Sequence, residues 1–144
     1  MKAILSFFPG RRIFQPANIE VKSSPLHGLG VFARKRIGKG MLIEKAPVVF
    51  LPEEARQTLQ HTKLFNYYFL LKNAARPAAF GFGFASFYNH SGEANAFYKF
   101  SAKRNTLNIY AFRTIHAGGE ITINYNGHPR DKSPVYFPES TAHE

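Results

Sequence analysis

The sequence of 144 residues contains no cysteine and no tryptophan, and only nine of its residues are acidic. Without cysteine the chain can form neither disulfide bonds nor thiolate zinc sites, and it has no thiol nucleophile. The six histidines are scattered without the spacing of metal ligands, so we expect no metal site. Motifs of phosphate-binding loops and of zinc proteases are also absent, which excludes these classes of enzyme.

No stretch is long and apolar enough to span a membrane, and residues 1–9 are too short for the hydrophobic region of a signal peptide. We therefore expect a soluble, intracellular protein without membrane contact. The acidic residues are outnumbered by 19 Lys and Arg, and the formal net charge of +10 indicates attraction to polyanions such as nucleic acids. The densest cationic run, residues 34–36, is typical of a solvated turn.

Hydrophobic residues make up 44% of the chain and aromatic residues 15%. This composition suits a globular domain with an aromatic core or an aromatic-lined pocket, and it excludes a disordered chain. A length of 144 residues corresponds to one domain. Short alternating runs with turns about every eight to twelve residues indicate a mostly β fold with a minor helical part. Strands are predicted at residues 19–23, 29–33, 41–44 and 48–51, from residue 97, at 107–112 and at 121–124.

Residues 52–72 give the only substantial helical pattern. Pro52 and the two acids after it are typical of a helix start, because proline is tolerated in the first turn and acids favour that end. Apolar residues then recur three or four positions apart over residues 56–72. We predict a helix over this range, broken near Thr62. Before it, Pro47 is expected to separate two strands.

Residues 84–95 begin as a run of aromatic and small residues and then change abruptly to polar turn chemistry. Asn89, His90 and Ser91 in succession supply donors, acceptors and a titratable ring. Asn95 can tie the turn together through its amide. The simplest interpretation is a hydrogen-bonded loop between two core segments. The alternative is a functional loop, and two further stretches favour that alternative.

Residues 27–33 contain a G-x-G turn and a short apolar strand, and residues 118–125 contain a G-G turn, an alternating strand and a tyrosine. In this order and at these separations, the three stretches resemble the SET domain of protein-lysine methyltransferases. The family pattern reads G-x-G-V-F-A, then N-H-S-x-x-x-N, then G-E-E-[LI]-T-x-x-Y. The resemblance covers about residues 19–126. It is closest to the minimal stand-alone SET proteins of large viruses and bacteria, whose L-G-F-G segment is similar to residues 82–85.

The resemblance implies a fold and a division of the chain. SET domains consist of small curled β-sheets with a short helical insert, and their C-terminal segment forms a pseudoknot beside the N-H-S stretch. For this chain the resemblance implies an N-terminal arm at residues 1–17 and a SET domain at 18–127, with the insert at about 53–76. Residues 128–144 would form a tail that takes the place of a zinc-containing module.

The resemblance also implies transfer of a methyl group from S-adenosylmethionine to lysine. Deprotonating lysine near pH 7 costs about 4–5 kcal/mol, because its pKa is about 10.4, whereas alignment of the reactants contributes about 7–11 kcal/mol. Geometry is therefore the larger contribution. Tyr125 is the implied catalytic residue, and its expected roles are orientation and electrostatic help, because a pKa near 10 makes a poor base. The alternative is a core tyrosine that ends a strand.

The same resemblance assigns residues to the donor. Asn89 would bind the amino group of S-adenosylmethionine and His90 its adenine, partly through backbone groups. The G-x-G turn would let the backbone approach the methionine part; without the other motifs it would be a plain glycine turn. An aromatic lid around Phe137 would fold over the adenine and the lysine channel. The residues expected to bind the donor are Gly28, Leu29, Gly30, Asn89, His90, Tyr125 and Phe137.

Three residues are expected to line the lysine channel. Tyr67 lies on the predicted helix, and helix packing is the alternative for it. Tyr88 directly precedes the N-H-S stretch and could equally pack in the core. Ile123 occupies the position where Phe or Tyr often tunes the number of methyl groups added, so its aliphatic side chain leaves the product state open.

The partners follow from the resemblance and from the charge. We expect a lysine-containing protein substrate, either a histone or another basic protein associated with DNA or ribosomes. The net charge of +10 predicts contact with nucleic acid, and minimal SET proteins can form homodimers. The alternative function is a SET-fold module without turnover that binds nucleic acid or chromatin through its basic surface.

Overall fold

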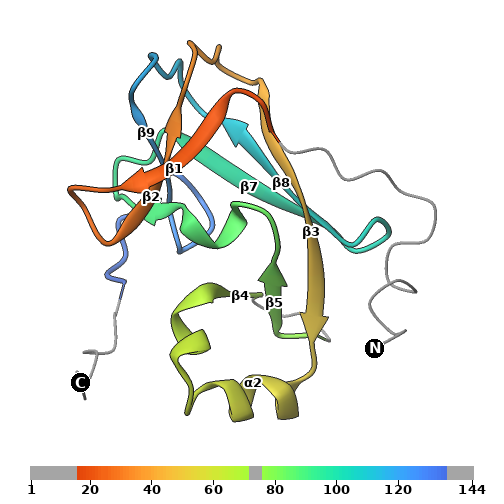
Figure 1. The fold of residues 1–144 in the computed structure, drawn as a ribbon. Coiled ribbons are helices and arrows are strands. Elements are labelled where there is room, and N and C mark those ends of the chain that lie inside the picture. Colours follow the sequence, from red (N-terminus) through yellow and green to blue (C-terminus); the bar gives the residue numbers. More distant parts are fainter. Residues whose placement is uncertain (1–15, 72–75, 136–144) are drawn as a thin grey trace.

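A computed structural model of the protein describes residues 16–71 and 76–135 (Figure 1). Within these ranges the chain forms two sheets and a small helical part, which confirms the predicted mostly β fold. The strands are β1 (Ile19–Ser23), β2 (Leu29–Ala33), β3 (Leu42–Leu51), β4 (Tyr68–Leu70), β5 (Ala78–Gly81), β6 (Asn89–His90), β7 (Ala96–Ser101), β8 (Thr106–Ala111) and β9 (Glu120–Ile123), and the helices are α2 (Glu53–Leu59) and the 3₁₀ helices η1 (Lys63–Tyr67) and η2 (Ala85–Phe87).

The four-stranded sheet has the strand order β1-β2-β9-β6. β1 and β2 form an antiparallel pair, with Ile19 opposite Ala33. β9 pairs antiparallel with β2 on one side and parallel with β6 on the other. Residues 89–90 and the strand before Tyr125 therefore lie side by side, in the neighbourhood that the predicted pseudoknot requires (Figure 1).

The five-stranded sheet has the strand order β4-β5-β3-β8-β7. The prediction of two strands separated by Pro47 is wrong, because β3 runs unbroken through this residue. Pro47 lies opposite Thr106 at the end of the pairing with β8, and the pairing with β5 begins at Val48 opposite Gly81. A proline without a backbone N–H is tolerated where a strand changes partners.

The core lies between the sheets and confirms the predicted alternation of β8. Leu107, Ile109 and Ala111 are buried, while the residues between them are only half-buried. Ile121 and Ile123 of β9 are fully buried in the same hydrophobic cluster. Non-polar side chains of both sheets therefore share one core, as expected for a single domain.

Aromatic rings pack against the five-stranded sheet. Phe69 of β4 has its ring centroid 5.3 Å from that of Tyr98 and 5.8 Å from that of Phe100, both on β7. Phe50 of β3 lies 6.1 Å from Phe100. These four residues form a cluster of edge-to-face and tilted contacts, the geometry that aromatic pairs prefer. We call it the aromatic cluster.

The helical part is shorter than predicted. α2 ends at Leu59, and the predicted break near Thr62 is confirmed, since the Thr62 side chain accepts a hydrogen bond from the N–H of Leu64 at the start of η1. The prediction of a helix is wrong for residues 68–70, because they form β4, which pairs with β5 and extends the sheet. Tertiary pairing overrides the helical spacing here. Within the described residues, no helix is long and apolar enough to cross a membrane.

Candidate active site

The side-chain amide of Asn89 joins the three stretches that the sequence singled out. Asn89 is 9% exposed, and its Nδ2 donates to the backbone carbonyl oxygens of His27 and Leu29, both at 3.1 Å. The same nitrogen donates to Oε1 of Glu120 at 2.8 Å. Since two hydrogens serve three acceptors, at least one of these bonds is shared. The G-x-G turn, the N-H-S stretch and the start of β9 are therefore held as one unit.

Glu120 is a central residue of this unit that the sequence analysis missed. Its two carboxylate oxygens accept hydrogen bonds from the Ser24 hydroxyl at 2.8 and 2.9 Å, across 96 positions of the chain. The Ser24 oxygen in turn accepts from the N–H of Leu26 at 2.9 Å. The one available signal was the acid in the G-G-E-I-T run, and its partners could not be read from the sequence. We call Ser24, Gly30, Asn89 and Glu120 the Asn89 cluster.

Gly30 lies close against this cluster. A Cβ atom at Gly30 would lie 2.3 Å from Oε1 of Glu120 and 3.0 Å from Nδ2 of Asn89, so a side chain there would have to push the Glu120 carboxylate aside. Gly28 has a φ of +47°, in the left-handed region that favours glycine, and nothing lies within 4 Å of its would-be Cβ. The two glycines therefore serve different purposes, one for close approach and one for the turn. Leu29 between them is exposed.

His90 connects the Asn89 cluster to Tyr125. Nδ1 of His90 accepts a hydrogen bond from the backbone N–H of Tyr125 at 3.2 Å, and the two ring centroids are 5.2 Å apart. Burial lowers the pKa of His90 below its ordinary value, which favours the neutral imidazole that this acceptor role requires. The predicted donor-binding histidine and the predicted catalytic tyrosine are thus direct neighbours.

The Tyr125 hydroxyl has a fixed direction although the residue is 40% exposed. It donates to the backbone carbonyl oxygen of Tyr88 at 2.9 Å. Burial of the phenol raises its pKa, so the hydroxyl keeps its proton near neutral pH. Such a phenol is a poor base, and the catalytic role of Tyr125 stays a prediction.

Tyr88 contributes its backbone, while its side chain is in the core. The ring is 2% exposed, and the hydroxyl donates to Oε2 of Glu44 at 2.9 Å. Glu44 lies on β3, is 4% exposed, and its Oε1 accepts from the N–H of Phe84 at 2.9 Å. Burial raises the pKa of Glu44, and burial together with the neighbouring Glu44 raises that of Tyr88. This pair anchors the segment that presents the Tyr88 carbonyl to Tyr125.

Tyr98 is an aromatic neighbour of Tyr125 that the sequence analysis did not single out. Burial, and electrostatic interaction with Tyr125, raise the pKa of Tyr98 to about 12. Its hydroxyl oxygen would be 3.8 Å from a Cβ atom at Gly127, just beyond Tyr125 in the chain. The aromatic cluster therefore reaches the catalytic candidate through Tyr98, which makes it one wall of the surroundings of Tyr125.

The remaining predicted channel and lid residues are distributed as follows. The Ile123 side chain is fully buried in the hydrophobic core. Tyr67 is exposed at the end of η1, and its backbone carbonyl accepts from the Ser86 hydroxyl at 3.0 Å. Phe137 lies outside the described residues, so the predicted lid stays a prediction.

The Asn89 cluster has the chemistry to hold a small cationic ligand with an amino group. The hydrogen bonds recorded for the Asn89 side chain all involve Nδ2, and its Oδ1 can accept from an ammonium group. The carboxylate of Glu120 adds negative charge, which complements a cation. Gly30 lets the backbone come close, and the half-buried ring of His90 offers a flat neighbour. Tyr125 adjoins this group through His90.

Comparisons with known proteins agree with this geometry. A family model described as SET domain matches residues 28–126. A protein of Schizosaccharomyces pombe named histone-lysine N-methyltransferase, H3 lysine-37 specific, is 32% identical over 111 residues, which are 76% of this chain and 74% of the relative. A crystal structure of a Plasmodium falciparum protein named as a putative histone methyltransferase has a TM-score of 0.60 at 31% identity, and the match covers 75% of this chain and 92% of that one.

A more distant structure shows the fold alone. An apo ctPRC2 structure with mutations in Ezh2 has a TM-score of 0.61 at 20% identity, and the match covers 74% of this chain but 15% of that one. The family match spans well over half of the chain, so the chain belongs to the SET-domain family. It is a protein-lysine N-methyltransferase, an enzyme that transfers a methyl group to the side-chain amine of lysine in a protein.

Proposed function

We propose that the enzyme takes its methyl group from S-adenosylmethionine and that its protein substrate is a histone. Bound S-adenosylmethionine supplies a methyl group on a sulfonium, which is already electrophilic. The carboxylate of Glu120 and the Oδ1 of Asn89 suit the positive charge and amino group of this donor. Gly28, Leu29 and Gly30 would lie along its methionine part, and His90 beside its adenine.

The chain's own residues would supply position more than acid–base chemistry. Tyr125 keeps its proton, and its hydroxyl points along a fixed direction set by the Tyr88 carbonyl at 2.9 Å. A rigid hydroxyl of this kind can hold the lysine amine and the methyl group in line. This alignment is expected to lower the activation barrier more than deprotonation of the amine does. Dry aromatic walls favour the neutral amine of lysine, because burial disfavours its charged form. Tyr98 and the half-exposed Tyr125 provide such walls.

The single observation that carries this proposal is the placement of Tyr125. The backbone N–H of Tyr125 is bound to His90 and its hydroxyl to the Tyr88 carbonyl, and its ring lies 5.2 Å from that of His90. A core tyrosine that merely ends a strand would not need to be 40% exposed beside a polar cluster.

The proposal of a histone substrate is based on the names of the two relatives that are about one-third identical to this chain. We propose histones as the class of substrate and no particular lysine. Such a substrate would place the enzyme with chromatin inside the cell. Homodimer formation stays a prediction. Mass spectrometry of purified core histones after incubation with the enzyme and labelled donor tests the substrate class. Methylation confined to non-histone proteins of the same lysate would contradict it.

Tyr125→Phe tests the function. The hydroxyl donates its hydrogen to the Tyr88 carbonyl, so its oxygen can accept from the lysine amine. Removing this oriented group should lower kcat by about 10²-fold, comparable to the loss of one preorganised hydrogen-bonding group in an active site. Calorimetry with S-adenosylhomocysteine should give an affinity within about threefold of the parent, because the Asn89 cluster is untouched. Tyr110 is a half-buried tyrosine on β8, and Tyr110→Phe, which also removes one hydroxyl, serves as the matched control. Full turnover by Tyr125→Phe, or no binding of S-adenosylhomocysteine by the parent, would contradict the proposal.

A further inference from the structure

A hollow of the surface away from the Asn89 cluster, of about 510 Å³, is lined mainly by cations. Four cationic side chains face one carboxylate, so the lining carries a net charge of three positive units (four minus one). None of these residues belongs to the Asn89 cluster. We call the hollow the basic cleft; it is lined by Lys39, Glu93, Phe112, Arg113, Pro129, Arg130 and Lys132.

Four separate segments build the basic cleft. Lys39 comes from the turn between β2 and β3, and Glu93 from the loop between β6 and β7. Phe112 and Arg113 come from the segment after β8, and the remaining three residues follow Tyr125. The isolated bridge between Ile37 and Ile115 holds the first and third of these together. The cations are therefore gathered by the fold, and their neighbourhood could not be read from the sequence.

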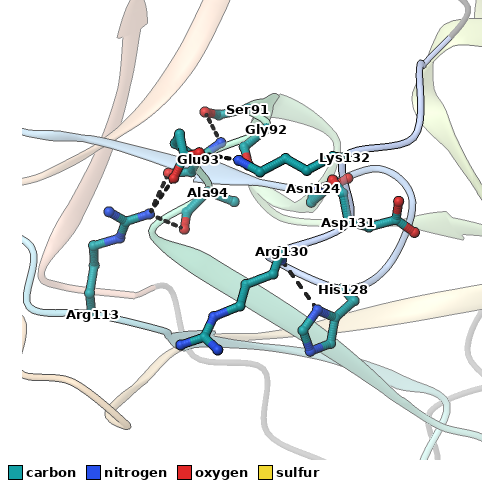
Figure 2. Close-up of polar contacts among 10 residues, drawn as sticks. All are labelled: Ser91, Gly92, Glu93, Ala94, Arg113, Asn124, His128, Arg130, Asp131 and Lys132. Atoms are coloured by element: carbon teal, nitrogen blue, oxygen red, sulfur yellow. Dashed lines mark hydrogen bonds and ion pairs between the residues drawn. The ribbon is translucent and has the colours of Figure 1, made fainter.

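The segment after Tyr125 is fixed by polar contacts. Nδ2 of Asn124 donates to the carbonyl of Asp131, and Oδ1 of Asp131 accepts from the N–H of Ser133 at 2.8 Å. His128 Nδ1 accepts from the N–H of Arg130 at 3.2 Å, as Figure 2 shows. These contacts hold the cations of this segment in place, because they order the backbone that carries them.

Two cations are preorganised around Glu93 (Figure 2). Nη2 of Arg113 donates to the carbonyls of Glu93 and Ala94 at 2.7 and 3.0 Å and lies 3.9 Å from the Glu93 carboxylate. Lys132 donates to the carbonyl of Gly92 at 3.1 Å and forms an ion pair with Glu93. The recorded contacts of Arg113 all use Nη2, and its other guanidinium nitrogens remain as donors. Both side chains are at least half exposed, so a ligand can reach them.

Two further cations flank this pair. Arg130 lies over the ring of Phe112, 5.5 Å from its centroid, a contact that orients the guanidinium. Lys39 is exposed, and so is the run at residues 34–36 just before it, which confirms the predicted solvated turn. The cationic surface therefore extends beyond the cleft itself.

We propose that the basic cleft binds the phosphate backbone of duplex DNA. Guanidinium groups present several N–H donors in a fork that matches phosphate, and the lysines add point charges. One aromatic ring packed under Arg130 is a poor platform for stacking unpaired bases, so the cleft suits backbone contacts more than base reading. This inference also bears on the proposed function, on which the following point rests. A protein with a net charge of +10 repels basic histone tails, and binding to the DNA around the histones would overcome this repulsion.

The experiment uses the full chain and a fluorescein-labelled duplex of about 20 base pairs, followed by anisotropy at several salt concentrations. The cleft variant is Lys39→Glu with Arg130→Glu. The matched control is Lys63→Glu with Lys103→Glu, which changes the charge equally at exposed positions outside the cleft. We expect the cleft variant to bind at least about tenfold more weakly, with a salt slope lower by about two, and the control to change by less than about threefold.

A second measurement uses the unaltered protein and does not depend on the variants folding. Bound duplex should protect Lys39 and Lys132 from acetylation by a water-soluble reagent, whereas Lys63 and Lys103 should react as in the free protein. Equal losses in the two variants, protection of all four lysines alike, or tighter binding of poly-glutamate than of duplex would each overturn the proposal. None of these measurements requires turnover, so a failure of the proposed methyl transfer would leave them interpretable.

Discussion

The two sheets of this protein are held together by different kinds of contact. In the four-stranded sheet, polar side chains join segments that are far apart in the chain: Ser24 to Glu120 across 96 positions and Asn89 to His27 across 62. In the five-stranded sheet, strands are joined by packing of aromatic rings, such as Phe69 and Phe100, whose centroids are 5.8 Å apart. Hydrogen bonds are directional, whereas burial of rings is not.

The difference suggests a division between geometry and stability. Directional contacts fix where the backbone of the G-x-G turn lies, which a bound donor would sense to within fractions of an ångström. Ring packing contributes free energy of folding and tolerates small shifts. Tyr125 interacts with both regions, since its N–H donates to His90 of the first sheet and its phenol interacts electrostatically with Tyr98 of the second. Substitutions in the two sheets should therefore affect different measurements.

The largest effect is expected in the aromatic cluster. Phe100 touches Phe50, Phe69 and Tyr98, with centroid distances of 6.1, 5.8 and 5.7 Å. Phe100→Ala should lower the free energy of unfolding by about 2–4 kcal/mol, because it leaves a cavity among these rings. Urea denaturation measures this loss, and Phe100→Leu, which keeps most of the volume, should lose about half as much.

The same variant tests the division itself. For folded Phe100→Ala, calorimetry should show S-adenosylhomocysteine affinity within about threefold of the parent. A loss of affinity as large as the loss of stability would break the comparison, since the two sheets would then act as one unit.

A smaller effect is expected at Gly30. The added methyl group of Gly30→Ala would lie 2.3 Å from the Glu120 carboxylate and must displace it from Asn89. We expect S-adenosylhomocysteine affinity to fall by about 10–100-fold, or about 1.4–2.7 kcal/mol, with a smaller change in stability. Gly92→Ala is the matched control, because nothing lies within 4 Å of the added atom there. Equal affinities of Gly30→Ala and the control would show that the Asn89 cluster does not shape the donor site.

Local patterns in the sequence predicted most of the strands. Alternation placed β1 and β8, and a short apolar run placed β2. The hairpin turn before Thr106 contains Asn105 at a φ of 48°, a conformation that asparagine tolerates. The errors occurred where pairing outweighs local preference. β4 has helical spacing but joins β5, and Pro47 sits inside a strand because the strand changes partners there. Neither fact has a local signature.

The candidate site divides in the same way. Asn89, His90 and Tyr125 could be named because they lie in short motifs, and the structure makes them neighbours. Glu120 and Tyr98 were missed because their importance comes from partners far away in the chain, and such contacts leave no periodicity to read. Of the predicted channel residues, Tyr88 and Ile123 have buried side chains, and a position in a motif does not by itself distinguish a core side chain from one that lines a channel.

Glu44 crosses the boundary between the two regions and gives the smallest expected effect. It belongs to β3 of the five-stranded sheet, yet its carboxylate holds the Phe84 N–H and the Tyr88 hydroxyl. A Cβ atom at Gly83 would lie 2.6 Å from its Oε1, so the loop is fitted closely around this acid. Through Tyr88 the carboxylate helps position the carbonyl that orients Tyr125.

Glu44→Gln should lower the free energy of unfolding by about 1 kcal/mol at acidic pH, because one hydrogen bond to Tyr88 is lost, and should lower kcat by about threefold.

The pH dependence of the free energy of unfolding sharpens the test. Burial raises the pKa of Glu44 above its ordinary 4.5, so the native state holds this proton more tightly than the unfolded chain. The stability that this group contributes is complete below about pH 4.5 and is lost as the pH rises through the raised pKa. Glutamine does not titrate, so the deficit of the variant should shrink as the pH rises through this window. A deficit that grows with pH would mean that the ionised carboxylate is the stabilising form and that its contacts outweigh its burial.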